Sequence, residues 1–201
     1  MAEEEHPLES TTRNFKTTKG TVSYVELSDL IAPHLLALFD DISDGKYRER
    51  ELDEFMIQDF HRRITGEIIP NIAGKWRTVP VRVGNHIPPE PYEVPILMHE
   101  YAENLNARIK NADTLELQIE ALAYAEGAFL HIHPFEDFNG RTIRALLLEL
   151  LLRFNLPPID TAVARETAAF KDYQDCLADY DNGRPSPLQR FWEERFKSDL
   201  S

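Results

Sequence analysis

The sequence predicts an all-α fold, a helical bundle that carries one small β-hairpin. Apolar residues recur at spacings of three and four through most of the 201 residues, as they do in amphipathic helices. Residues 139–155 are apolar almost all round, which indicates a central, buried helix. Residues 74–95 alternate valines with polar residues and then gain several prolines, a pattern that favours a hairpin over a helix.

Composition limits the class of protein. A length of 201 residues suits one domain, expected here over residues 21–201 with a core at about 51–160. The net charge of −13 argues against nucleic acid as a partner. No apolar run reaches the ~20 residues of a membrane span, and the acidic N-terminus lacks a signal-peptide pattern. We therefore expect no membrane association and a cytoplasmic location, with secretion that needs no cleaved signal left open.

The N-terminal region begins with a polar stretch that has little periodicity. Residues 1–20 are expected to form a flexible or irregular arm. Ser28 and Asp29 are suitable caps for a helix that would run to Ile42, with Pro33 near its first turn.

The next helix is predicted over residues 51–69, where apolar side chains recur at helical spacing until Pro70. His61 lies on this helix, and we expect it to be a packing or surface residue.

The stretch from residue 74 to residue 95 is expected to form an exposed, two-stranded flap. Val79, Val81 and Val83 alternate with other residues, as in a strand. The prolines that follow exclude a central position in a sheet, because proline has no N–H to donate.

The C-terminal half reads as a series of helices. Asp113 is a suitable cap for the second of them. The predicted helices span residues 94–110, 114–132, 139–155, 161–180 and 187–197.

An anion site is predicted where a polar loop enters the helix at residue 139. Asn139 is a good N-cap type, and Gly140 permits close approach of a ligand to the backbone. The free N–H groups of a first helical turn attract anions. Arg141 and Arg144 are three residues apart and share a helix face, so together they suit a polyphosphate.

The same loop carries two further groups that suit phosphoryl or nucleotidyl transfer. Asp137 could hold a Mg²⁺ ion that phosphates also bind, and His133 could act as a general base near neutral pH. A metal pair of His131 and His133 is the weaker alternative. Their spacing of two does not place both on one helix face, and no third ligand is evident.

Residues 133–144 closely resemble the signature of the Fic family, within the Fic/Doc superfamily. That signature reads His-Pro-Phe-any-Asp/Glu-Gly-Asn-Gly-Arg-any-any-Arg. Every fixed position is matched here except the first glycine, which is Phe138. The resemblance implies a Fic-type helical bundle in which the flap arches over the active site.

The resemblance also implies a function, namely transfer of AMP from ATP to a Tyr, Thr or Ser hydroxyl of a target protein. It makes His133 the catalytic base and Asp137 the Mg²⁺ ligand. It assigns binding of the nucleotide phosphates to Asn139, Gly140, Arg141 and Arg144, and binding of the target to Val79, Val81 and Val83. The inhibitory helix motif common in the family is not found in the sequence. Control by a separate antitoxin, by self-assembly or by the acidic arm is therefore expected.

Phe138 leaves the donor open. A phenylalanine is strained at positive φ and fills space that glycine leaves to the nucleotide. Either the loop keeps a negative φ or its phosphate-binding end is reshaped, and the side chain stacks on a ligand or packs inward. The alternatives are transfer of UMP, GMP, phosphate or phosphocholine, or a nucleotide-binding regulator without turnover.

Overall fold

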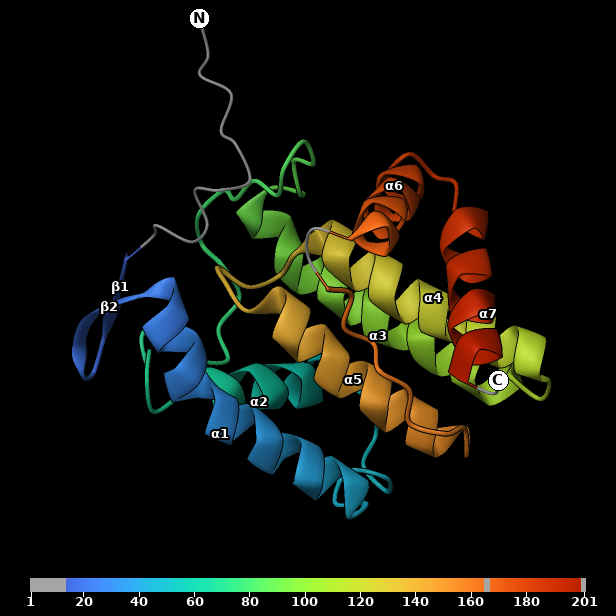
Figure 1. The fold of residues 1–201 in the computed structure, drawn as a ribbon, viewed down its shortest axis with the longest axis horizontal. Coiled ribbons are helices and arrows are strands. Elements are labelled where there is room, and N and C mark those ends of the chain that lie inside the picture. The colour runs from blue at the N-terminus through green and yellow to red at the C-terminus, as the bar shows by residue number, and fades with distance from the viewer. Residues whose placement is uncertain (1–13, 165–166, 200–201) are drawn as a thin grey trace, which may run out of the picture.

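The protein is a bundle of α-helices, which confirms the predicted class. A computed structural model describes residues 14–164 and 167–199, which contain seven α-helices and one two-stranded antiparallel sheet (Figure 1). A short 3₁₀-helix, Pro91–Glu93, leads into the third α-helix. The α-helices are α1 (Tyr24–Ser43), α2 (Glu54–Thr65), α3 (Val94–Asn111), α4 (Leu115–Ile132), α5 (Asn139–Arg153), α6 (Ala168–Asp181) and α7 (Ser186–Asp199).

Helix α5 lies at the centre of the bundle, as its apolar sequence predicts. It packs against α1, α2 and α4, and its side chains from Ala145 to Leu147 are fully buried. Figure 1 shows α4 and α5 in the middle, with α1 and α2 on one side and α6 and α7 on the other. The loop that joins α4 to α5 is therefore held at both ends by core helices.

The small sheet lies at the N-terminal end and not in the predicted flap. Strand β1 (Asn14–Thr17) pairs with β2 (Gly20–Ser23), so residues 14–20 are not the irregular arm that the sequence suggested. Phe15 is only 8% exposed, and the turn at Thr18 donates to the carbonyl oxygens of Glu67 and Ile68. Strands of four residues are too short to show a period, and these contacts are distant in sequence. The rest of the predicted arm, residues 1–13, lies outside the described residues.

Helix α1 begins earlier than predicted. Ser23 caps it in a reciprocal capping box with Glu26, which satisfies two N–H groups at the helix start. Ser28 lies inside the helix and donates its hydroxyl to the Tyr24 carbonyl. Pro33 is consequently in the helix interior and not in its first turn.

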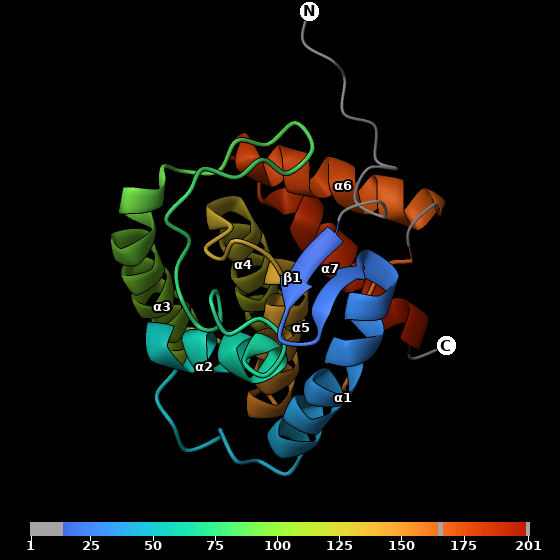
Figure 2. The same ribbon diagram turned by 90° about the vertical axis from the view of Figure 1, so that its left-hand side faces the viewer.

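The predicted flap is an extended loop and not a two-stranded hairpin. Only Val83 and His86 form a bridge within it, by two mutual backbone hydrogen bonds of 3.1 and 3.0 Å. Pro80, Pro88 and Pro89 have no N–H, so a longer ladder cannot form. Figure 2 shows this loop, between α2 and α3, rising from the level of α2 to the top of the molecule beside α6.

Two other helix starts differ from the predictions. Helix α4 is capped by Thr114, whose hydroxyl accepts from the Leu117 N–H, and not by Asp113. Helix α6 begins at Ala168 after its cap Thr167, so it is shorter than the predicted helix over residues 161–180. In the described residues, no helix combines the length and the apolar character that a membrane crossing requires.

Helices α6 and α7 are fastened to α4 by a buried carboxylate. Glu126 accepts from Tyr173 at 2.7 Å, from Trp192 at 2.8 Å and from Arg195 at 3.2 Å. It is only 2% exposed, and its three donors compensate the cost of its burial. The C-terminal helices thus support the helix that ends at His133.

Candidate functional site

His133 stands at the end of α4 in a conformation that turns the chain sharply. It is the C-cap of that helix, with φ 49° and ψ 61° in the left-handed region. Its Nδ1 atom is buried and has no hydrogen-bond partner in the described residues. Burial lowers the pKa of His133 to about 4, against a small opposing effect of the Leu130 carbonyl. The imidazole is therefore neutral at pH 7 and able to accept a proton.

Arg77, which the sequence analysis did not single out, holds the backbone of His133. Its Nε donates to the His133 carbonyl at 2.8 Å, and its Nη2 donates to the carbonyls of Ile132 at 3.3 Å and Pro89 at 2.5 Å. Its own backbone N–H donates to the Pro134 carbonyl at 2.9 Å. Arg77 is 3% exposed, and its hydrogen bonds join the flap loop to the loop between α4 and α5. The contacts cross 56 residues of sequence, and no local pattern indicates them.

His61 holds the other side of the same loop from α2. Its Nδ1 accepts from the Gly74 N–H at 2.9 Å, so Nε2 carries the proton and donates to the Asp137 carbonyl at 3.2 Å. Its ring stacks on Phe135 with centroids 3.8 Å apart. Burial lowers the pKa of His61 to about 4, which fits a neutral ring with both nitrogens engaged. The expectation that His61 packs is confirmed, but its hydrogen bonds to the loop were not foreseen.

Phe138 keeps the backbone conformation that the missing glycine would adopt. Its φ is 61°, so the loop is not relieved of positive φ, and the side chain packs inward at 4% exposure. The carboxylate of Asp137 accepts from the Phe138 N–H at 2.8 Å, which helps to hold this turn. The expected negative φ is therefore wrong, and of the two placements considered for the side chain the structure shows inward packing.

Asn139 closes the loop and does not cap α5. Its side chain accepts from the Phe135 N–H at 3.0 Å and donates to the Phe135 carbonyl at 2.9 Å. Phe138 occupies the cap position, without a side-chain hydrogen bond. The predicted N-cap is wrong because Asn139 is already inside the helix and 2% exposed, where its amide pairs with the preceding turn.

The first turn of α5 is open to solvent at Gly140. A Cβ at this position would meet no atom within 4 Å, so a ligand has room beside the backbone. The Arg141 N–H already donates to the Phe138 carbonyl at 3.1 Å, which removes it from the predicted set of anion-binding amides. The Gly140 N–H has no partner in the described residues and stays available.

The two arginines of the motif lie near one another. Arg141 donates from Nη2 to the Ser28 hydroxyl at 2.9 Å and lies over the Phe138 ring, 5.2 Å from its centroid. Arg144 donates from Nε to the Gly140 carbonyl at 3.2 Å. Burial, and secondarily the charge of Arg141, lowers the pKa of Arg144. Two guanidiniums side by side form a concentrated positive patch on an acidic protein.

Arg144 also lines a cavity of about 180 Å³ between α1, α5 and residues 159–161. Asp160 lines the same cavity, but no ion pair joins Arg144 to a carboxylate within residues 14–164 and 167–199. The buried carboxylate of Glu126 is bonded to Trp192 and Arg195 of α7. Among the described residues, Asp160 acts on the Arg144 guanidinium only through its charge and without a direct ion pair.

The three valines of the flap are placed outside the core. Val79 is 45% and Val83 41% exposed, and Val81 is half-buried. In the described part of the chain, the only backbone-to-backbone hydrogen bonds made by residues 78–89 are those between Val83 and His86. The loop therefore offers backbone edges and apolar side chains next to the segment that Arg77 ties to His133.

His131 and His133 do not form the metal pair considered from the sequence. His131 Nδ1 lies 2.8 Å from Asp181 Oδ1 at the end of α6, whereas the Nδ1 of His133 is buried without a partner in the described residues. The fold gives His131 a different set of neighbours.

The chain matches the family model described as the Fic/DOC family over residues 51–151, about half of its length. It is 36% identical to "Protein adenylyltransferase Fic" of Aedes aegypti over 135 residues, which cover 67% of this chain and 26% of that protein. It is 40% identical to the protein of the same name in Drosophila melanogaster over 103 residues, 51% of this chain and 20% of that protein. The chain thus spans about a quarter or less of the length of these relatives.

Solved structures share the fold. Fic-1 of C. elegans, residues 134–508, superposes with a TM-score of 0.66 at 25% identity, covering 83% of this chain and 48% of that one. The BepC protein of Bartonella tribocorum, solved with bound AMPPNP, superposes with a TM-score of 0.69 at 16% identity, covering 91% of this chain and 92% of that one. The similarity to BepC supports the fold alone.

Proposed function

This chain belongs to the Fic/DOC family, and on that premise we propose that it transfers AMP from ATP to a hydroxyl side chain of a target protein. The observation that carries the proposal is His133, a neutral imidazole whose backbone is held by Arg77 in the loop that leads into the open first turn of α5. Relatives named protein adenylyltransferase support the choice of AMP.

His133 acts as the general base in this reaction. It takes the proton of the target hydroxyl while the hydroxyl oxygen forms a bond to the α-phosphorus. The bond from that phosphorus to the bridging oxygen breaks, and pyrophosphate leaves. A lowered pKa keeps the ring unprotonated before the substrate binds. The negative charge of the bound triphosphate raises the proton affinity of the ring at the moment it is needed.

The start of α5 binds the phosphates. The Gly140 N–H and the positive end of the helix favour an anion, and Arg141 and Arg144 supply the two guanidiniums. Asn139 contributes by holding the turn closed and not by its own contact with a phosphate.

Asp137 is the residue that fits a Mg²⁺ ion. A single carboxylate combined with substrate phosphates and water is the donor set that Mg²⁺ prefers. When bound, the ion neutralises charge on the phosphates. The turn around Asp137 is held by His61 through the backbone and by the Phe138 N–H through the carboxylate.

The flap loop positions the target. Its backbone pairs with no strand of the described residues, which suits the addition of an extended segment of the target, and Val79, Val81 and Val83 provide apolar contacts to it. The tie from Arg77 to the backbone of His133 sets the flap against the base.

Phe138 is compatible with turnover. Its side chain is buried and does not fill the open side of α5 at Gly140. A regulator without turnover is therefore less well supported than an enzyme. Transfer of phosphate is the alternative outcome of the test below, whereas transfer of UMP, GMP or phosphocholine would leave no label from ATP on protein.

The activity is controlled by a group other than the carboxylates of the described residues. Arg144 has no ion pair within residues 14–164 and 167–199, so we propose inhibition by a separate antitoxin or by self-assembly. A carboxylate from the partner would pair with Arg144 and displace the donor phosphates.

Labelled ATP tests the proposal. The protein is incubated with cell extract, Mg²⁺ and ATP that carries the label on either the α- or the γ-phosphate. Retention of the α-label alone on protein indicates AMP transfer, and retention of the γ-label indicates phosphorylation. His133→Ala is expected to lower the rate by ~10²–10⁴-fold, the usual contribution of a general base. No label of either kind, with ATP still bound, would contradict transfer of AMP from ATP.

A further inference from the structure

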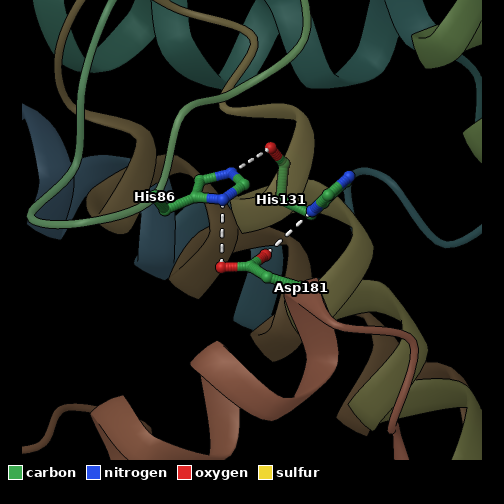
Figure 3. A group of neighbouring side chains, drawn as sticks. All are labelled: His86, His131 and Asp181. Atoms are coloured by element: carbon green, nitrogen blue, oxygen red, sulfur yellow. Dashed lines mark hydrogen bonds and ion pairs between the residues drawn. The ribbon is translucent and has the colours of Figure 1, made fainter.

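Two histidines and one aspartate from distant parts of the chain meet beside the catalytic loop (Figure 3). His86 lies in the flap loop, His131 in the last turn of α4, and Asp181 at the end of α6. His86 Nδ1 is 3.1 Å from Asp181 Oδ2, and His131 Nδ1 is 2.8 Å from Asp181 Oδ1. One nitrogen of each ring and a carboxylate oxygen lie within 4.8 Å of one another.

The hydrogen bonds of His86 require a positive centre between it and Asp181. Its Nε2 lies 2.8 Å from the His131 carbonyl oxygen, which only accepts, so Nε2 carries the hydrogen. In a neutral imidazole, Nδ1 then presents a lone pair to a carboxylate oxygen at 3.1 Å. Two lone pairs repel at that distance. Either a second proton or a metal ion must therefore lie between them.

The third member of the group completes a donor set for a metal ion. The two contacts to Asp181 are also met by a proton on His86 and a neutral His131 that donates from Nδ1. The observation that points to an ion is that two imidazole nitrogens and a carboxylate oxygen from three separate elements lie within 4.8 Å of one another. The Nε2 hydrogen bond from His86 to a backbone carbonyl is also the second contact that metal-binding histidines usually make.

We propose that His86, His131 and Asp181 bind one Zn²⁺ ion. Two imidazole nitrogens and a carboxylate oxygen, with a fourth position open to water, are a common zinc donor set. Bonds of 2.0–2.1 Å in a tetrahedron separate ligand atoms by about 3.3 Å. The two nitrogens lie 3.1 and 2.8 Å from different oxygens of Asp181, and one ligand atom from each residue lies within 4.8 Å of the others, so every separation is within about 1.5 Å of that spacing.

The ion would restrict the movement of the flap loop. His131 is two residues before His133, and His86 lies in the loop whose other anchor is Arg77. Bound zinc would join this loop to the ends of α4 and α6 and so hold it against the site.

Direct zinc binding tests the proposal without reference to activity. The purified 201-residue chain is treated with EDTA to remove bound metal and is then titrated with ZnCl₂ at pH 7 by calorimetry. In a second measurement, its Tm is recorded with zinc and with EDTA. We expect one zinc per chain and a higher Tm with zinc. His86→Gln and Asp181→Asn should each weaken binding by at least ~10-fold, the low end of the cost of disturbing a zinc ligand shell.

The matched control is His34→Gln, which removes a histidine elsewhere on the surface and should bind zinc as the wild type does. Asp181→Asn preserves the size of the side chain, so it tests the proposal even if the His86→Gln protein does not fold. Absence of zinc binding in the wild type would overturn the proposal and leave the extra proton on His86 as the positive centre. Equal binding by all four proteins would also overturn it.

Discussion

The Nε atom of Arg77 donates to the backbone carbonyl of His133 at 2.8 Å, which links the flap loop directly to the residue proposed as the base. The same guanidinium also holds the carbonyls of Ile132 and Pro89. The position of the base and the position of the flap are thus set by one buried side chain, and a change there should alter both.

Replacing Arg77 is expected to reduce both stability and activity. Arg77→Ala leaves the carbonyls of His133 and Pro89 without their donor, at a cost of ~1–3 kcal/mol for each buried group. Arg77→Lys restores the charge but not the planar fork, and should fall between alanine and wild type. Urea denaturation and kcat/KM for AMP transfer check the two effects.

Arg82→Ala is the control for stability, because Arg82 is exposed and bonds only locally, to the Gly84 carbonyl. It should stay within about 0.5 kcal/mol of the wild type. A loss in Arg77→Ala no larger than that of the control would contradict the anchoring role.

Stability should fall as the pH decreases from about 6.5 to about 4, partly through His61. The pKa of His61 is lowered from 6.5 to about 4 in the folded protein, so between these values the unfolded chain binds a proton that the folded chain does not. The loss from this group amounts to about 3 kcal/mol when complete. His61→Gln should be less stable at pH 7 but lose less on acidification. An unchanged slope of unfolding free energy against pH in His61→Gln would refute this account.

The pH dependence of transfer should reflect the lowered pKa of His133. The free protein keeps its base unprotonated down to about pH 4, so kcat/KM should stay level from pH 8 to about 5 and then fall. Bound triphosphate stabilises the protonated ring, so the acidic limb of kcat should lie at higher pH. Circular dichroism at each pH shows whether a loss of activity comes from protonation of His133 or from unfolding of the protein. A kcat/KM limb at pH 6.5 or above would contradict the buried, neutral base.

Phe138→Gly should destabilise the protein although it removes a strained conformation. Positive φ at a phenylalanine costs ~1–2 kcal/mol, whereas truncation of a buried phenylalanine costs ~3–5 kcal/mol. The net loss should be about 2–3 kcal/mol by urea denaturation. Phe138→Leu retains most of the apolar volume and should be less affected. A glycine variant as stable as the wild type would show that the Phe138 side chain contributes little to packing.

The helices and the motif could be predicted from sequence because both depend on local patterns. Helix α5 was recognisable by its apolar residues, and the loop before it by its close match to a known signature. The role of Asn139 was misjudged, since its side chain suits both a cap and a closed turn. The folded loop places the backbone of Phe135 within hydrogen-bond distance of the Asn139 side chain, and this contact makes Asn139 close the turn instead of capping the helix.

The contacts that hold the site could not be predicted, because they join residues far apart in sequence. Arg77, His61 and His86 each bond to the loop or its flank across 45 to 76 residues. The N-terminal hairpin was missed for a similar reason, since Phe15 is buried by the folded bundle and not by a pattern of its own. The strand pairing expected in the flap does not form, because the prolines there have no backbone N–H to donate.

Intact mass is the most direct measure of the central claim. Wild type, His133→Ala and the control His99→Gln, at an exposed histidine on α3, are incubated with Mg²⁺, ATP and cell extract, and modified proteins are weighed by mass spectrometry. The account predicts a mass increase of one AMP on a protein hydroxyl with wild type and His99→Gln, and none with His133→Ala. An AMP adduct of equal yield with His133→Ala, or an adduct of a different mass, would contradict it.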